Sequence, residues 1–107
     1  RDFVHIMDLA SGHVAALRWL DNAPKGFDVF NLGTGAGTSI QQITTAMEMV
    51  TGKKIPCKVG TRRPGDLGVV YANVSKAVAV LEWRAVHDLV SICRDAWKWE
   101  LACDANV

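Results

Sequence analysis

The chain has 107 residues, of which 50% are hydrophobic, and its 12 basic and 11 acidic residues leave a net charge of +1. This length suits one domain with a modest core, and the composition excludes intrinsic disorder. Because no basic patch carries interleaved aromatics and no apolar run approaches the ~20 residues of a membrane span, neither nucleic acid nor a membrane is an expected partner. The irregular spacing of Cys57, Cys93 and Cys103 predicts reduced thiols in a cytosolic protein and no zinc site.

The first 32 residues predict a strand, a helix and a second strand. Residues 3–6 form a short strand-like run, and Asp8 is the expected N-cap of a helix that continues to about Leu20. The stretch at 22–26 breaks this helix, and the apolar run at 27–32 predicts the next strand. This alternation is typical of an α/β protein.

A glycine-rich loop, GTGAG at 33–37, follows the second predicted strand in the manner of a dinucleotide-binding loop. The fingerprint of such loops is G-x-G-x-x-G, whereas here the third glycine comes one residue early and Thr38 fills its place. About 20 residues further on, where a ribose-binding acid is expected, the chain holds three lysines and no carboxylate before Asp66. The loop is therefore predicted to be a strand-to-helix turn without a cofactor, although a ligand could lie near it.

The next elements are a helix and a short strand. Helical spacing of apolar residues predicts a helix over 39–51, with Ser39 and Gln42 as its capping box and Gly52 at its end. Residues 56–59 suit a third strand.

The remaining segments complete a small α/β layer. An exposed loop is predicted at 61–66, an extended apolar run at 69–72, a short helix at 75–81 and a final helix from about Asp88 to Cys103. The final helix is expected to turn inward Leu89, Ile92, Cys93, Ala96 and Trp97. The strands are too few to form a sheet that stands alone. Because the chain starts without methionine and enters a strand-like run at once, we expect it to be a piece of a longer protein.

Most titratable side chains give no functional signal. His5, His13 and His87 lack the spacing of a helical metal site, so structural roles are expected for them. Tyr71 and Lys76 lie five residues apart, rather than the four of a catalytic Tyr–Lys pair, and are not assigned to catalysis.

One cluster, RRPGD at 62–66, does suggest chemistry. The guanidiniums of Arg62 and Arg63 on a rigid turn suit phosphate oxygens, and the Asp66 carboxylate could accept hydrogen bonds from ribose hydroxyls. The alternative is a solvated loop whose Arg and Asp side chains pair with each other. Arg1 adds a further basic group just before the first predicted strand.

Several longer motifs carry a family resemblance. They are RDFVHIMDLASGHVAALRWL, NLGTGAGTSIQQI, GKKIP, RRPGDLGVVYANVSKA and AWKWE. Together, and in this order, they resemble the carboxyl-terminal part of UDP-galactose (UDP-glucose) 4-epimerases, which are extended short-chain dehydrogenase/reductases. The resemblance covers nearly all of the chain.

The resemblance implies that residues 1–107 are an α/β substrate-binding segment, a single-domain fragment without the amino-terminal Rossmann domain. That missing domain would bind NAD and carry the catalytic Tyr-x-x-x-Lys pair, so no catalytic, cofactor-binding or metal-binding residue is assigned here. By matching motif positions, the resemblance places Arg1 and Arg63 on the pyrophosphate of a UDP-sugar, and Asp66 on the uridine ribose. Val70 would lie beside the sugar ring, with Tyr71 pointing the opposite way.

The implied activity is the interconversion of UDP-glucose and UDP-galactose by a cytoplasmic, homodimeric, full-length enzyme, with the isolated segment inactive. Because members with a small residue at position 70 admit N-acetylated sugars, UDP-GlcNAc and UDP-GalNAc are also expected substrates. Two sequence departures are Phe3, where tyrosine is more usual, and Glu82, where glycine is usual after a helix. The alternatives are a non-catalytic UDP-sugar-binding or packing fragment, and an epimerase of UDP-pentoses or UDP-uronic acids.

Overall fold

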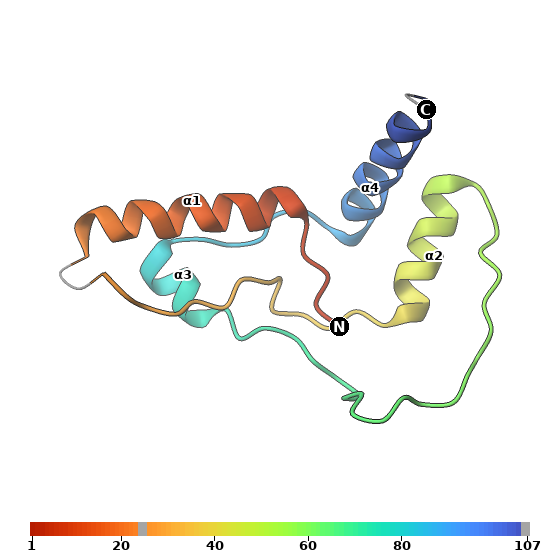
Figure 1. Cartoon of the computed structure of the whole chain (residues 1–107), viewed down its shortest axis with the longest axis horizontal. Helices are drawn as coiled ribbons and strands as arrows, with labels where there is room; N and C mark the ends of the chain where they lie inside the picture. The colour runs from red at the N-terminus through yellow and green to blue at the C-terminus, as the bar shows by residue number, and fades with distance from the viewer. Residues whose placement is uncertain (24–25, 106–107) are drawn as a thin grey trace.

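The computed structural model describes residues 1–23 and 26–105, and four helices carry its regular structure (Figure 1). They are α1 Ile6–Asn22, α2 Ile40–Thr51, α3 Ser75–Leu81 and α4 Leu89–Asp104. α1 packs against α3, and α2 packs against α4, so the chain forms two helix pairs joined by long extended segments. Within the described residues, no helix is both long and apolar enough to cross a membrane.

The three segments predicted as strands form no β-ladder within the part of the chain described here, and neither does the predicted extended run at 69–72. The predicted strands are 3–6, of which Ile6 already belongs to α1, together with 27–32 and 56–59. A strand exists through hydrogen bonds to a neighbouring strand, and none of these four segments finds such a neighbour in the described chain. The helices of the predicted α/β layer are therefore present, whereas the predicted strands have no neighbouring strand among the described residues.

Local signals set the bounds of three helices. Ser39 and Gln42 form the predicted capping box, with Gln42 N–H 3.1 Å from Ser39 Oγ and Ser39 N–H 2.8 Å from Gln42 Oε1. Gly52 ends α2 in the left-handed conformation. The predicted bounds of α3 are confirmed, and Asp88 caps α4 by accepting a hydrogen bond from Ser91 N–H. On α4, Cys93 is buried as expected, whereas Ala96 is exposed.

The start of α1 differs from the prediction. The N-cap is His5, whose Nδ1 accepts a hydrogen bond from Met7 N–H at 3.1 Å, and the helix begins at Ile6. Asp8, the expected cap, lies inside the first turn, where its carboxylate is buried and bonded to residues far along the chain. The cap prediction was wrong because a distant partner competes for this carboxylate.

The described residues enclose only a small core, in which the buried hydrophobic residues are Ala46, Ala77, Trp83 and Cys93. Its radius of gyration is 17.0 Å, whereas a compact domain of this length has about 13 Å. Its accessible surface is 8287 Å², against roughly 5,900 Å² for a compact monomer of this size. Many large apolar side chains are exposed, among them Ile6, Phe27, Val59, Val86 and Trp99. Extensive apolar surface is thus left available for contact with further protein.

Glu82 carries a local backbone strain at the end of α3. It is the one non-glycine residue with a positive φ (52°) among those described, and the following Trp83 N–H closes the helix end onto Ala77 O at 3.3 Å. This left-handed position favours glycine, since a Cβ clashes with the carbonyl there.

We therefore expect Glu82→Gly to stabilise the protein by about 0.5–1 kcal/mol, the conformational gain being partly offset by a more flexible unfolded chain. Urea denaturation measures this free energy. The control Glu82→Ala removes the carboxylate but keeps the Cβ, so it should not stabilise. A gain in both variants would trace the effect to charge instead of backbone conformation.

Candidate functional site

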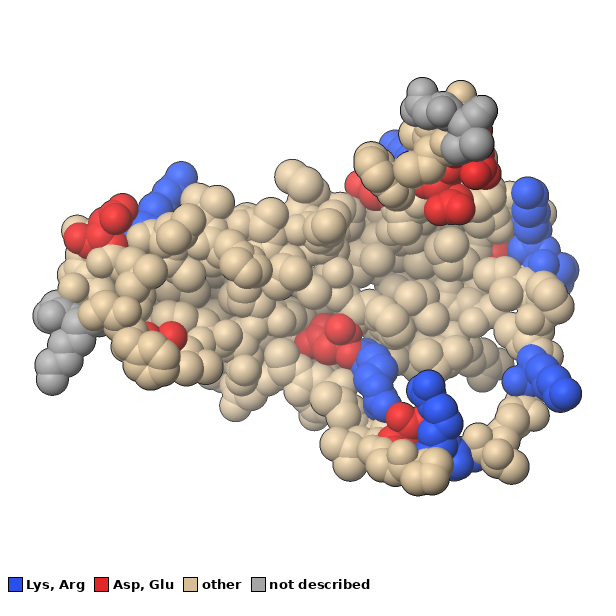
Figure 2. All heavy atoms as spheres, in the orientation of Figure 1, with Lys and Arg blue, Asp and Glu red and all other residues tan. Residues whose placement is uncertain are grey.

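The predicted basic turn lies beside the amino-terminal residue. Arg63 Nε is 3.1 Å from Asp66 Oδ2, and Arg62 Nη2 donates to Asp66 O at 3.1 Å. Arg1 reaches the same place from the other end of the chain, since its Nη2 is 3.8 Å from Asp66 Oδ1 and its Nη1 donates to Leu67 O at 2.8 Å. Figure 2 shows basic and acidic atoms gathered where this loop passes the amino terminus. The structure thus brings Arg1, Arg63 and Asp66 into one cluster.

The contact between Arg63 and Asp66 is also the one that a solvated loop would make. However, the Arg63 side chain is 85% exposed, and such surface ion pairs contribute only about 0–1 kcal/mol. A phosphate could replace the Asp66 carboxylate as the partner of Arg63 at little cost. The additional approach of Arg1 is not required by a loop that pairs within itself.

A hollow of about 530 Å³ opens next to this cluster. Its lining includes Arg1, Asp2, Asn31, Val70 and Tyr71. Arg63 and Asp66 do not line it, and are linked to it through Arg1. Val70 and Tyr71 both border the hollow, and the expected opposite orientation of their side chains stays a prediction.

The glycine loop holds a carboxylate of the chain itself. Thr34 N–H and Gly35 N–H donate to the Asp2 carboxylate at 2.9 and 3.1 Å, so the groups that would face a pyrophosphate are already engaged. Burial pushes the pKa of Asp2 upward, but the hydrogen bonds that it accepts outweigh this and lower that pKa below its ordinary value. Sequence reasoning did not assign a role to Asp2; the clue was a glycine loop without an external ligand.

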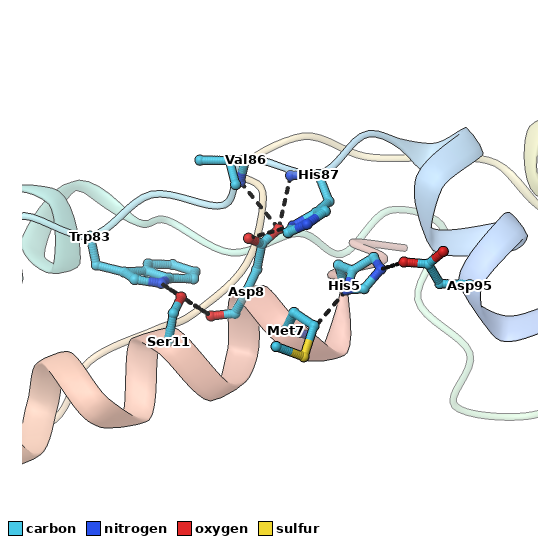
Figure 3. A network of polar contacts seen from close by, with 8 residues as sticks. All are labelled: His5, Met7, Asp8, Ser11, Trp83, Val86, His87 and Asp95. Carbon is cyan, nitrogen blue, oxygen red and sulfur yellow. Dashed lines mark hydrogen bonds and ion pairs between the residues drawn. The ribbon is translucent and has the colours of Figure 1, made fainter. Parts of the chain in front are cut away.

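A second polar network joins α1 to the segment before α4 and to α4 (Figure 3). The stacked rings of His5 and His87 have centroids 4.2 Å apart, His5 Nε2 lies 3.1 Å from Asp95 Oδ2, and His87 Nδ1 lies 2.8 Å from Asp8 Oδ1. Trp83 Nε1 donates to Asp8 O at 3.1 Å. These contacts agree with the structural roles predicted for His5 and His87.

Comparison with known proteins gives matches to epimerases, although no protein-family model matches the chain. UDP-glucose 4-epimerase 2 of Arabidopsis thaliana is 50% identical over 99 residues, which are 92% of this chain and 28% of that protein. The crystal structure of a UDP-glucose 4-epimerase from Stenotrophomonas maltophila, with bound NAD and formylated UDP-arabinopyranose, has a TM-score of 0.91 and 41% identity over 100% of this chain and 32% of its own. The crystal structure of a UDP-glucose 4-epimerase from Bifidobacterium longum, in complex with NAD+ and UDP, has a TM-score of 0.85 and 39% identity. That match covers 95% of this chain and 30% of the Bifidobacterium longum chain. The chain thus spans about 30% of the length of these proteins.

Proposed function

We propose that this chain, which matches the carboxyl-terminal part of UDP-glucose 4-epimerases, supplies the UDP-sugar-binding part of such an enzyme. The complete enzyme would interconvert UDP-glucose and UDP-galactose, and also UDP-GlcNAc and UDP-GalNAc, as a cytoplasmic homodimer in the Leloir pathway of galactose metabolism. The observation that carries the proposal is the convergence of Arg1 and Arg63 on Asp66 in a segment with this similarity.

The geometry supports an exchange of partners when UDP binds. The two guanidiniums would turn from the Asp66 carboxylate to the pyrophosphate oxygens, which they can hold through bidentate charge-assisted bonds. Asp66 would then be free to accept hydrogen bonds from the uridine ribose hydroxyls. Anchoring the nucleotide firmly at this end leaves the hexose room to turn, so these residues contribute binding and orientation instead of bond-making.

The residues of this chain do not fit NAD. The glycine loop has the wrong spacing, and its Thr34 and Gly35 N–H groups are bonded to Asp2. We therefore place NAD binding and the hydride chemistry in the part of the enzyme outside this chain, and we expect the 107 residues alone to be inactive. The large exposed apolar surface suits contact with that remaining part.

Two other functions are distinguished by substrate assays of the complete protein. An epimerase acting on UDP-pentoses is favoured by the UDP-arabinopyranose derivative in the Stenotrophomonas maltophila structure, and would turn over UDP-xylose faster than UDP-galactose. A non-catalytic fragment would bind UDP-sugars and convert none of them. Conversion of UDP-galactose to UDP-glucose in a coupled assay supports the proposed function.

The role of Arg63 is tested by its replacement in the complete enzyme. Arg63→Ala should weaken UDP binding by about 1.5–3 kcal/mol, because one charge-assisted contact to a phosphate is lost. NAD binding should be weakened less than UDP binding, since we place the NAD site outside this chain. Isothermal titration calorimetry with UDP and with NAD measures both affinities.

Arg62→Ala is the matched control, because Arg62 sits on the same turn but donates to the Asp66 backbone oxygen. Its effect on UDP affinity should be clearly smaller. Unchanged UDP affinity in Arg63→Ala would identify the turn as a solvated loop. Equal losses in both variants would assign the effect to the shape of the turn.

A further inference from the structure

The Asp2 carboxylate joins three segments that are far apart in the sequence. Besides the N–H groups of the glycine loop, it accepts a hydrogen bond from Thr34 Oγ1 at 2.6 Å and one from Ala72 N–H at 3.1 Å. Gly35, with a φ of +77°, helps to turn successive N–H groups toward one point, as in the concave backbone sites that bind anions. The glycine loop thus binds the Asp2 carboxylate in the way that such backbone sites bind a free anion.

The fit around this carboxylate is close. A Cβ added to Gly33 would lie 2.5 Å from Asp2 Oδ2 and 2.7 Å from the Ala72 Cβ, so only glycine permits this approach. Every hydrogen bond that Thr34, Gly35 and Ala72 make to the two Asp2 oxygens is donated to them, which an ionised carboxylate can accept and an amide nitrogen cannot.

This junction lies next to two of the proposed substrate-binding residues. Arg1 directly precedes Asp2, and its backbone pairs with Thr38, whose N–H donates to Arg1 O at 2.7 Å. Val70 lies two residues before Ala72, whose N–H is bonded to Asp2. Arg1 and Val70 border the same hollow, so the Asp2 contacts set how far apart these two residues stand.

We propose that Asp2 is a positioning residue for UDP-sugar binding, which acts by holding Arg1 and the Val70 segment against the glycine loop. This proposal rests on the proposed function. Asp2 touches no substrate in it; its contribution passes through Arg1 and through the shape of the hollow. The lowered pKa of Asp2 keeps it ionised in this role at neutral pH.

The test uses Asp2→Asn in the complete enzyme, a change of nearly the same shape that replaces one acceptor oxygen by a donor. The KM for UDP-galactose should rise about tenfold, while kcat changes less than about threefold, because anchoring is impaired and the chemical groups lie elsewhere. Asp104→Asn, at the exposed end of α4, removes the same charge and should change neither constant.

A double-mutant cycle separates positioning from general stability. If Asp2 acts through Arg1, then Asp2→Asn should add less than about threefold to the KM of Arg1→Ala. Full additivity of the two changes, or an unchanged KM in Asp2→Asn, would overturn the proposal. If Asp2→Asn fails to fold, Thr34→Ala decides, since it removes one donor to Asp2 and should raise KM about two- to fivefold; an unchanged KM there would overturn it. Wild-type enzyme that bound no UDP would instead refute the proposed function.

Discussion

Replacing Asp8 with alanine should destabilise the protein by about 3–5 kcal/mol, because it removes a buried charged acceptor and leaves its donors unpaired. The Asp8 side chain is 3% exposed. Its carboxylate accepts hydrogen bonds from Val86 N–H at 3.1 Å, from His87 N–H at 3.0 Å and from the His87 ring. These contacts tie the start of α1 to the segment that leads into α4 (Figure 3). Urea denaturation of the complete protein measures the loss.

Two variants sharpen this result. Asp8→Asn keeps the volume and one acceptor oxygen, so its loss should be smaller. Asp21→Ala, on the exposed far end of α1, should change stability by less than about 0.5 kcal/mol. A small loss in Asp8→Ala would mean that water replaces the carboxylate and that the network is not a structural joint.

The Asp8 contribution should also depend on pH. Burial raises the pKa of Asp8, but the hydrogen bonds from His87 and Val86 outweigh this and hold it below its ordinary value. A depressed folded-state pKa means that the contribution is complete above the unfolded value, near ~3.9, and is lost as the pH falls through the lower folded value. The stability difference between wild type and Asp8→Ala should therefore be constant above about pH 5 and narrow at more acidic pH. A difference that stays constant into strong acid would contradict this account.

Introducing tyrosine at Val70 should reduce turnover of UDP-GlcNAc and UDP-GalNAc by about 100-fold or more, and spare most turnover of UDP-glucose and UDP-galactose. Val70 is 42% exposed and borders the hollow next to Arg1. If Val70 lies beside the sugar ring as proposed, valine would leave room for the 2-acetamido group, whereas a phenol ring would occupy that space. Steady-state rates with both substrate pairs, in wild type and variant, measure the effect.

Two control variants test a smaller side chain at position 70 and the hydroxyl group of the neighbouring Tyr71. Val70→Ala should retain both activities, because it enlarges the same space. Tyr71 borders the same hollow, so Tyr71→Phe tests whether its hydroxyl sets the preference instead. Wild-type enzyme without activity on UDP-GalNAc, or equal loss of both activities in Val70→Tyr, would show that Val70 does not limit the sugar.

Helices whose signals are local could be predicted from the sequence. The capping box of Ser39 and Gln42, the short helix at 75–81 and the cap at Asp88 all depend on residues within one or two helical turns of each other. The end of α3 follows a local rule as well, because the position after a helix usually holds glycine, although this chain has Glu82 there. Glu82 takes the left-handed conformation although it is not glycine, and the next residue, Trp83, is buried.

The start of α1 and the strands could not be predicted in the same way. Asp8 has the chemistry of a helix cap, but its partners lie 78 and 79 residues further along the chain, and no local pattern reports them. Extended segments such as 27–32 have strand-like composition, yet a strand forms only where another strand meets it.

The candidate site also combines local contacts, which could be predicted from the sequence, with distant contacts, which could not. Arg63 and Asp66 are three positions apart on one turn, so the composition and motif of that turn were enough to single it out. The approach of Arg1 to that turn, and the place of Asp2 in the glycine loop, depend on closing the chain over more than 30 residues. Such contacts arise from the sum of packing, chain entropy and distant hydrogen-bond partners, and therefore leave no periodic trace in the sequence.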